Sequence, residues 1–419
     1  MIRTIRADLR PGKTEGKPMD DYLLSGLKVL DVATVIAAPA AAMMLADFGA
    51  DVIKIEQPGD GDMLRSIKDV PETPEAADDY MWQMDCRNKR GMVLDLKTPA
   101  GIEVLHKLVA QCDVFITNHP YPVRESLGLT YEDLRPLKPD MIYASLTAYG
   151  EKGPERDRKG FDQLAYWARS GLMDLMRAPG TPPVQGLSGM GDHPTGVALY
   201  AGIVTALLHR ERTGEGGMVH TSLLANGLWS CSAIVQGIMA DGNAGLFREM
   251  RQAPPSMMRV YRCKDDRWLQ LNMVRNLELF SLLFMGLEAT HLLADERFKP
   301  ETMWENRVAL GEEIQKILVT RSSDEWLKVF ASSDVPVNRV AVVEEKKTDP
   351  QVLQNRMAVP PGDPGIGVPL LVNHPIKVTS VQQVEPKPPP QHGEHSEEIL
   401  LELGYDEGMI REMRDRGVI

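Results

Sequence analysis

The sequence lacks any long apolar segment. Its longest apolar run, residues 35–44, contains Pro39 and is soon followed by Asp47, so it falls short of the roughly 18–20 residues that a membrane helix needs. Residues 1–22 are polar and charged, without an apolar stretch followed by a small-residue cleavage site, so they do not resemble a secretory signal. We therefore expect no membrane segment and a cytoplasmic location.

Cysteine is scarce, and the four present are widely spaced, with no C-x-x-C pair: Cys86, Cys112, Cys231 and Cys263. This spacing favours buried or incidental thiols over a disulfide framework or a zinc site. His392 and His395 form an H-x-x-H pair in a charged stretch with no third ligand nearby, which favours a solvated segment. We expect no bound metal.

The common nucleotide and hydrolase motifs are also missing. There is no P-loop, no G-x-G-x-x-G after the first strand pattern and no G-x-S-x-G. The GDGD run at 59–62 carries two carboxylates that would repel phosphate, so we interpret it as a solvated turn. A net charge of −12 argues against nonspecific nucleic-acid binding.

What is present indicates a soluble, multi-domain α/β protein. Apolar residues make up 43% and charged residues 25% of 419 residues, which predicts stable cores in two or three units. Strand patterns alternate with helix patterns, and Thr98 caps a helix that begins at Pro99. The expected strands are 28–34, 51–56, 92–96, 113–117 and 141–147, with a helix at 40–48. This order predicts a doubly wound parallel sheet, and directs attention to the turns after Val32, Asn118 and Thr147.

Later segments predict further helices and a second unit. Long helices are expected at 161–176 and 194–213, a strand at 267–271, a capping box at Ser322 and Glu325, and one C-terminal helix. The expected organisation is an arm at 1–23, a large domain at 24–230, a linker at 231–257, a small α+β domain at 258–343, and a linker with the returning C-terminal helix at 344–419.

Three segments together carry a resemblance to a known family: VLDVATVIAAPAAAMMLADFGADVIKIEQPGDGD, GFDQLAYWARSGLM and GDHPTGVALYAGIVTALLHRERTGEGG. With NKRGMVLDLKTPAG and LGLTYEDLRPLKPDMIYASLTAYGEKGP, they resemble the family III coenzyme A transferases, which include formyl-CoA transferase, carnitine-CoA transferase and α-methylacyl-CoA racemase. The likeness extends from Leu24 onward and is nearest the aryl-lactate and 2-hydroxyacyl CoA-transferase branch.

The resemblance implies both a fold and a chemistry. It implies a large Rossmann-like domain built from N- and C-terminal parts, a smaller α+β domain and an interlocked-ring homodimer. Asp162, in the G-F-D turn, is implied as the covalent nucleophile, forming first a mixed anhydride and then an aspartyl-CoA thioester. Acyl-CoA and a carboxylic acid are the implied substrates, with no permanently bound cofactor. Backbone groups near Gly189 and Gly191 are candidates to stabilise the oxyanion.

The CoA-binding positions that the resemblance implies are Val35, Ile36, Ala37, Leu94, Lys97, Asn118, His119, Thr147, Ala148 and Tyr149. Two arginines usual in the family are replaced by Gln57 and Ser126. Arg65 or Arg124 would compensate for them.

Alternatives remain open. Gly180 stands where formyl-CoA transferases place their nucleophile, and Phe161 stands where racemases place a histidine, which leaves only Asp192 of the racemase pair. An acyl-CoA racemase or isomerase is one alternative. A non-catalytic CoA-binding protein, in which Asp162 only caps a helix, is another.

Overall fold

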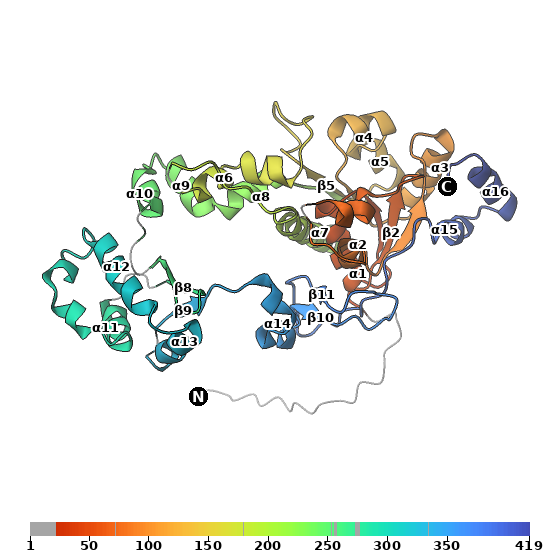
Figure 1. Ribbon diagram of the computed structural model, residues 1–419. Coiled ribbons are helices and arrows are strands. Elements are labelled where there is room, and N and C mark those ends of the chain that lie inside the picture. Colours follow the sequence, from red (N-terminus) through yellow and green to blue (C-terminus); the bar gives the residue numbers. More distant parts are fainter. Residues whose placement is uncertain are drawn as a thin grey trace, which may run out of the picture. The chain divides into compact units, whose positions relative to one another are not determined.

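The computed structural model describes residues 22–419 except 72, 179, 253, 255–257, 273–276 and 334. All but the last two residues of the expected arm at 1–23 lie outside the described residues. The chain divides into two compact units (Figure 1). Unit 1 holds the described residues within 1–173, 185–230 and 351–419, and unit 2 holds those within 174–184 and 231–350.

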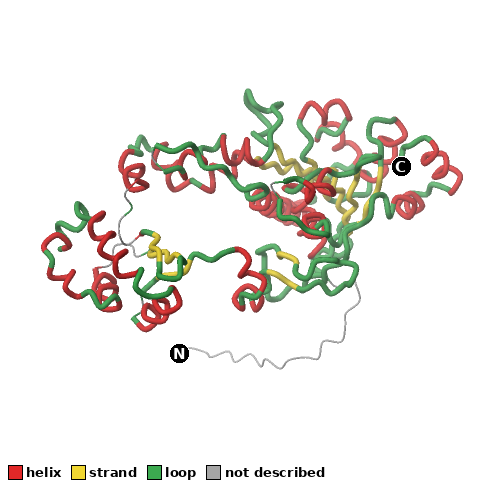
Figure 2. Tube along the Cα trace, in the orientation of Figure 1, coloured by secondary structure: helices red, strands yellow, loops and turns green. Residues whose placement is uncertain are grey.

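Unit 1 is built around a six-stranded sheet in which every pairing is parallel, and its strands are the yellow segments that run side by side in unit 1 in Figure 2. The strands are β1 (Lys28–Val32), β2 (Asp51–Glu56), β3 (Arg90–Val93), β4 (Val114–Thr117), β5 (Ile142–Thr147) and β6 (Gly217–Ser222). Their order is β3-β2-β1-β4-β5-β6, which confirms the expected doubly wound sheet. The chain reverses its direction of strand addition between β1 and β4, the position at which such sheets form their ligand crevice.

The remaining described strands are short, and helices account for most of the rest. In chain order the α-helices are α1 (Ala37–Asp47), α2 (Tyr80–Asp85), α3 (Pro99–Val109), α4 (Tyr121–Leu127), α5 (Tyr131–Leu134), α6 (Leu172–Met176), α7 (Asp192–Thr213), α8 (Leu223–Ser230), α9 (Ser232–Met239), α10 (Gly245–Gln252), α11 (Leu277–Gly286), α12 (Arg307–Leu318), α13 (Ser323–Ser332), α14 (Pro350–Gln354), α15 (Ser396–Glu402) and α16 (Glu407–Asp415). The other strands are β7 (Val260–Arg262), β8 (Trp268–Leu271), β9 (Val337–Arg339), β10 (Ala358–Val359) and β11 (Leu371–Val372).

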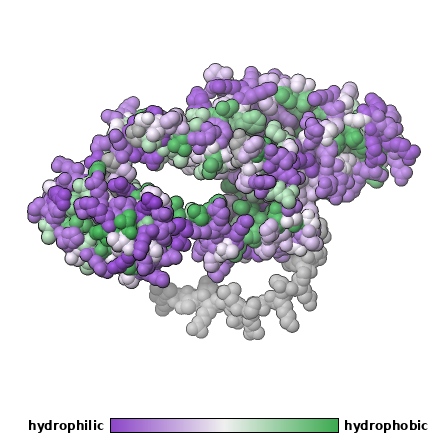
Figure 3. All heavy atoms as spheres, in the orientation of Figure 1, coloured by the Kyte–Doolittle hydropathy of each residue, from purple (hydrophilic) through white to green (hydrophobic). Residues whose placement is uncertain are grey.

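Two separate cores cover the faces of the parallel sheet. On one face, α1 and α7 pack closely, and a Cβ placed on Gly196 would lie only 2.6 Å from the backbone oxygen of Ala37. On the other face, α3 packs with the C-terminal helices, which bury Ile399, Leu400 and Ile410. The outward surface of α15 and α16 is largely hydrophilic in Figure 3, as expected for amphipathic helices.

Local signals predicted several elements correctly. The Thr98 side chain accepts a hydrogen bond from the Gly101 N–H, and the capping box at Ser322 and Glu325 is present. Strand β6 was missed because its sequence, GMVHTS, is half-polar and only partly buried at the sheet edge.

Two expected helices are each divided. The segment 161–176 forms a wide π-helical turn, η4 (Gln163–Ala168), and then α6, with Gly171 at φ 91° between them. The expected single C-terminal helix is α15 and α16, because Gly404 adopts φ 84° and Asp406 caps a new helix through the Met409 N–H. Both predictions of one continuous helix were wrong for the same reason, a left-handed glycine.

Unit 2 contains a three-stranded antiparallel sheet, in the order β7-β8-β9. Its core includes Tyr261, Leu269 and the stacked rings of Trp326 and Phe330. All four cysteines are buried and none of them forms a disulfide, as expected from their spacing. No helix among residues 22–419, leaving aside those not described, is long and apolar enough to cross a membrane.

Candidate active site

A cavity of about 190 Å³ lies beyond the C-terminal ends of β1, β4 and β5. The turns after these three strands supply much of its wall, as the strand order predicts. Its lining residues are Thr34, Val35, Ile36, Ala37, Asn118, Pro120, Leu146, Thr147, Ala148, Lys159, Gly160, Phe161, Asp192 and Leu223. Six of the expected CoA-binding residues are therefore brought together: Val35, Ile36, Ala37, Asn118, Thr147 and Ala148.

The turn after β1 is strained. Val35 has φ 66°, a left-handed conformation that is costly for a β-branched side chain. Its N–H donates to Asp62 Oδ1 at 3.0 Å, and Asp62 in turn forms an ion pair of 2.7 Å with Lys54. The Lys54 ammonium also donates to the carbonyl of Ala33. Lys54 and Asp62 therefore hold the strained turn at two points.

Asp62 corrects our interpretation of GDGD as a solvated turn. It is 3% exposed, and its carboxylate accepts hydrogen bonds from two backbone N–H groups besides the lysine. Burial alone would raise the pKa of Asp62, but the Lys54 charge and these hydrogen bonds lower it below its usual value. The sequence did not reveal that this acid has a buried cationic partner.

Asn118, directly after β4, holds the turn that follows β1 in place. Its Oδ1 accepts from the Thr34 N–H at 2.9 Å, and its Nδ2 donates to the Thr34 carbonyl at 2.7 Å. The amide therefore bridges the turns after β1 and β4 and contributes to the shape of the cavity.

Asp162 lies between the cavity residue Phe161 and the wide turn η4. Its side chain is buried, and Oδ2 accepts a hydrogen bond of 3.0 Å from the Gly191 N–H, while Oδ1 has no hydrogen-bond partner among the described residues. It makes no capping hydrogen bond to its own helix. Burial raises the pKa of Asp162, and the N–H groups of the turn at 189–192 oppose that increase.

A close-packed glycine turn supplies that N–H group. A Cβ added to Gly191 would lie 2.4 Å from Cγ of the Tyr166 ring, so the backbone reaches Asp162 only because position 191 has no side chain. Asp192, the next residue, lines the cavity. Burial and then the charge of Asp162 raise the pKa of Asp192 to about 7.

Arg65 and Arg124, which were expected to compensate for the two missing arginines, both form ion pairs with glutamates of the protein itself. Arg65 makes two 2.7 Å hydrogen bonds to Glu56 and lies 3.8 Å above the Trp82 ring. Arg124 is buried and pairs with Glu151 at 3.0 Å. Neither is among the residues that line the cavity.

The remaining expected CoA-binding positions also lie outside that lining. Leu94 is in the core under α3, and Lys97 is exposed. Burial lowers the pKa of His119 to about 4, which favours a neutral ring. The Tyr149 ring packs closely against Gly160, where an added Cβ would lie 2.9 Å from its hydroxyl.

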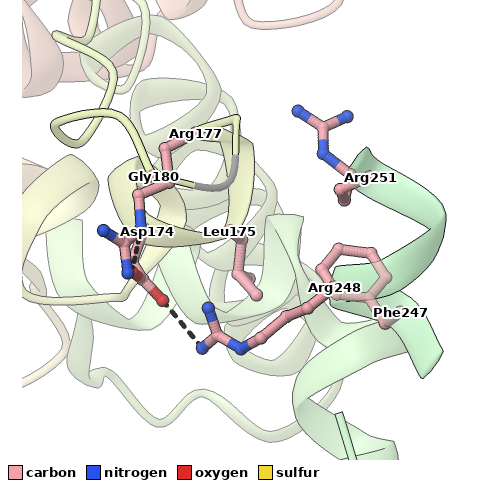
Figure 4. Close-up of a pocket in the computed structure, with 7 residues that line it drawn as sticks. All are labelled: Asp174, Leu175, Arg177, Gly180, Phe247, Arg248 and Arg251. Carbon is pink, nitrogen blue, oxygen red and sulfur yellow. Dashed lines mark hydrogen bonds and ion pairs between the residues drawn. The ribbon is translucent and has the colours of Figure 1, made fainter. Parts of the chain in front are cut away.

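A second hollow, in unit 2, contains Gly180, the position aligned with the formyl-CoA transferase nucleophile (Figure 4). The acid in its lining is Asp174, whose oxygens pair with Arg177 at 2.8 Å and Arg248 at 2.9 Å. These hydrogen bonds, the one from Arg248 most of all, lower the pKa of Asp174. A carboxylate held by two guanidinium groups is a poor nucleophile, so Asp174 does not supply the missing acid in this hollow.

Comparisons with known proteins agree on one family. The sequence model described as CoA-transferase family III matches residues 24–396. The (R)-2-hydroxy-4-methylpentanoate CoA-transferase of Clostridioides difficile is 32% identical over 403 residues, covering 95% of this chain and 99% of that protein. The cinnamoyl-CoA:phenyllactate CoA-transferase of Clostridium sporogenes is 32% identical over 406 residues, covering 95% and 97%.

A solved structure shows the same fold. The crystal structure of a CAIB/BAIF family protein from Brucella suis superposes with a TM-score of 0.78 at 27% identity, covering 91% of this chain and 99% of that one. The names of both relatives describe CoA-transferases for 2-hydroxy or aryl-lactate acids. This confirms the branch of the family that the sequence indicated.

Proposed function

Because the chain belongs to CoA-transferase family III and is a CoA-transferase, we propose that it moves coenzyme A from an acyl-CoA donor to a carboxylic acid through covalent intermediates on Asp162. The observation that carries this proposal is that the two oxygens of the buried Asp162 carboxyl group have different hydrogen-bond environments. Oδ2 is held by Gly191, and Oδ1 has no partner among the described residues.

The first half of the reaction releases the donor acid. Oδ1 of Asp162 attacks the thioester carbonyl carbon, the C–S bond breaks, and a mixed anhydride forms with CoA thiolate as leaving group. The thiolate then attacks Cγ of Asp162, which expels the donor carboxylate and leaves an aspartyl-CoA thioester. During this attack negative charge develops on Oδ2, where the Gly191 N–H already donates.

The second half runs the same steps in reverse with a new acid. The acceptor carboxylate attacks Cγ, releases CoA thiolate and forms the second mixed anhydride. The thiolate attacks the acceptor's acyl carbon, which yields the new acyl-CoA and restores the Asp162 carboxylate. Each intermediate preserves the free energy of the original thioester, which an ester on serine would not do.

The cavity supports a position for the thioester end of CoA. Its wall consists mainly of apolar and small residues from the turns after β1 and β5, and Lys159 adds a positive charge. We propose that Val35, Ile36, Ala37, Asn118, Thr147 and Ala148 contact CoA. Leu94, Lys97, His119 and Tyr149 remain proposed contacts, as do Arg65 and Arg124, although these two arginines pair with Glu56 and Glu151.

We further propose that the protein is cytoplasmic and forms a homodimer. We also propose that its acceptors are 2-hydroxy or aryl carboxylic acids, like those in the names of the two relatives. A panel of such acids, assayed with succinyl-CoA, acetyl-CoA and propionyl-CoA as donors, tests this specificity. Sedimentation velocity tests the dimer.

The activity itself is tested with two variants of Asp162 and one matched control. Asp162→Asn and Asp162→Ala remove the nucleophile and are expected to lower CoA exchange by at least about 10³-fold, whereas Asp174→Asn is expected to keep near-parental rates. Exchange measured by liquid chromatography at the parental rate in both Asp162 variants would refute the proposal. Incorporation of deuterium at the α-carbon of the acyl group, without CoA exchange, would instead support a racemase.

A further inference from the structure

The cavity wall that follows β1 contains a conformation that valine rarely adopts. Val35 has φ 66°, and the next two residues, Ile36 and Ala37, line the cavity with it. In the left-handed region a β-branched side chain crowds its own backbone, whereas glycine adopts this region freely. A costly conformation that the fold maintains at the wall of a ligand cavity indicates a functional constraint.

Helix α1 starts directly after this turn and has no cap. The N-cap residue, Ile36, makes no side-chain hydrogen bond, and the first turn of the helix contains no acidic residue. A polar side chain at the N-cap position would stabilise the helix. The chain therefore forgoes two common sources of stability at one place, a relaxed turn and a helix cap, and such places are expected at functional sites.

The Asp62 carboxylate binds the backbone of Val35. The Val35 N–H donates to Oδ1 of Asp62 at 3.0 Å, and the same nitrogen lies 3.3 Å from Oδ2. Asp62 is itself fixed, since Oδ1 accepts from the Leu64 N–H at 3.0 Å and its own N–H donates to Glu56 at 3.0 Å. The angle φ describes rotation about the bond between the Val35 nitrogen and Cα. The turn therefore cannot relax without either losing the bond to Asp62 or moving the residues that follow.

Lys54 is the cation that accompanies this buried carboxylate. It is completely buried, lies 2.7 Å from Oδ2 of Asp62 and also donates to the carbonyl of Ala33, two residues before Val35. Burial by itself lowers the pKa of Lys54, but the charges of Asp31 and Asp62 raise it above its usual value, so the ammonium group stays charged. A buried ion pair is weak evidence for added stability, and the fixing of one backbone geometry is a better reason for its presence.

We propose that Asp62, paired with Lys54, is a positioning residue that keeps Val35 in its left-handed conformation and thereby shapes the cavity wall for CoA. Neither Asp62 nor Lys54 is among the residues that line the cavity, so both act through the turn. This inference deepens the transferase proposal and rests on it for the identity of the ligand. It does not depend on which carboxyl group reacts.

A double-mutant cycle, measured by isothermal titration of CoA into the full-length protein, tests the proposal. Asp62→Ala removes the acceptor for the Val35 N–H and is expected to raise the Kd for CoA about tenfold, as when about one molecule in ten keeps the competent turn. In the Val35→Gly background the same substitution is expected to raise the Kd by no more than about threefold, because glycine populates both signs of φ about equally. An equal rise in both backgrounds, or no rise in the first, would overturn the proposal. Asp60→Asn, at an exposed position two residues before Asp62, is the control and should keep the parental affinity.

The strain itself is measured without changing Asp62. Val35→Gly and Val35→Ala both remove the γ-methyl groups, so they differ mainly in how easily position 35 adopts a positive φ. Val35→Gly is expected to unfold at a higher temperature than Val35→Ala, which is the reverse of the usual order of glycine and alanine. The usual order would overturn the proposal, even if Asp62→Ala fails to fold.

Steady-state kinetics separate positioning from a general loss of stability. In Asp62→Ala the KM for acyl-CoA is expected to rise about tenfold, while kcat changes less than about threefold. A variant that was merely less stable would instead lose kcat through its unfolded fraction and keep its KM, which would contradict the positioning role. A parental protein that does not bind CoA would refute the proposed function and this inference together. Parental binding with unchanged affinity in Asp62→Ala would refute the inference alone.

Discussion

At the scale of single residues, the proposed role of Asp162 as the nucleophile depends on how negative charge is shared with Asp192. Both carboxyl groups have raised pKa values, Asp162 because of burial and Asp192 because of burial and the charge of Asp162. A negative charge on Asp162 therefore opposes ionisation of Asp192. Because the pKa of Asp192 is raised to about 7, Asp192 still carries a proton in much of the population at neutral pH.

The titration of Asp192 predicts that the rate of CoA exchange depends on pH above neutrality. A group with a raised pKa is protonated below that pKa, so Asp192 gains its charge as the pH rises through about 7. The added charge repels the incoming carboxylate and thiolate, and the exchange rate is expected to fall. Asp192→Asn should abolish this fall, while Asp60→Asn, at an exposed turn, should preserve it. A decline unchanged in Asp192→Asn would show that another group titrates.

A second prediction concerns Gly191. In Gly191→Ala the new Cβ would lie 2.4 Å from the Tyr166 ring, so the turn must shift and its N–H must leave Asp162. Loss of one such donor costs about 10²-fold to 10³-fold in kcat, and KM for acyl-CoA is expected to change little. Gly217→Ala is the control, because its Cβ meets no atom within 4 Å. Steady-state kinetics that gave equal kcat values for the two variants would contradict this role of the N–H.

At the scale of elements, the approach of α1 to α7 sets the shape of the cavity. Gly196 on α7 touches the backbone of Ala37 at the start of α1, directly after the strained turn. Gly196→Ala is expected to destabilise the protein by about 1–3 kcal/mol through overpacking and to weaken CoA binding. Denaturant unfolding and CoA titration by calorimetry check both effects.

The matched control for Gly196→Ala is Gly237→Ala. Position 237 lies within α9, and its Cβ would meet no atom within 4 Å. The substitution is expected to stabilise the protein by about 0.4–1 kcal/mol, because alanine restricts the unfolded chain. If Gly196→Ala and Gly237→Ala destabilised the protein equally, overpacking of α7 against α1 would not be the cause of the lost stability.

The elements also show what the sequence could and could not predict. Strand β2 and the cap at Thr98 depend on neighbouring residues, and both were predicted correctly. The ion pairs of Lys54 with Asp62 and of Asp85 with His193 depend on which turns the fold brings together, and no local pattern marks them. The prediction that Asp162 is the nucleophile came only from the family resemblance, since its own surroundings predicted an ordinary helix cap.

At the scale of the whole molecule, the C-terminal segment completes unit 1. Arg90, the first residue of β3, pairs with Glu402 at 2.9 Å, and backbone N–H groups of β3 donate to the side chains of His395 and Ser396. Each large apolar side chain that α15 and α16 bury contributes about 1.5–3 kcal/mol. Together these contacts are comparable with the whole stability of a domain.

Removal of residues 391–419 is therefore expected to abolish cooperative thermal unfolding of unit 1 and CoA binding with it. Circular dichroism and CoA titration check this result. The control is Met409→Gln, a change at an exposed position of α16, which should leave the midpoint of unfolding nearly unchanged. A truncated chain that unfolds at the parental temperature would contradict the view that α15 and α16 complete the core.

The most direct test of the central claim is to trap the covalent enzyme. The protein is incubated with an acyl-CoA donor, quenched with hydroxylamine or borohydride and digested, and the peptide that contains position 162 is examined by mass spectrometry. A hydroxamate or alcohol at Asp162, dependent on the donor and absent from Asp162→Ala, is the predicted result. A modified peptide that instead carries the label at Asp174 or Asp192, with Asp162 unchanged, would contradict the account.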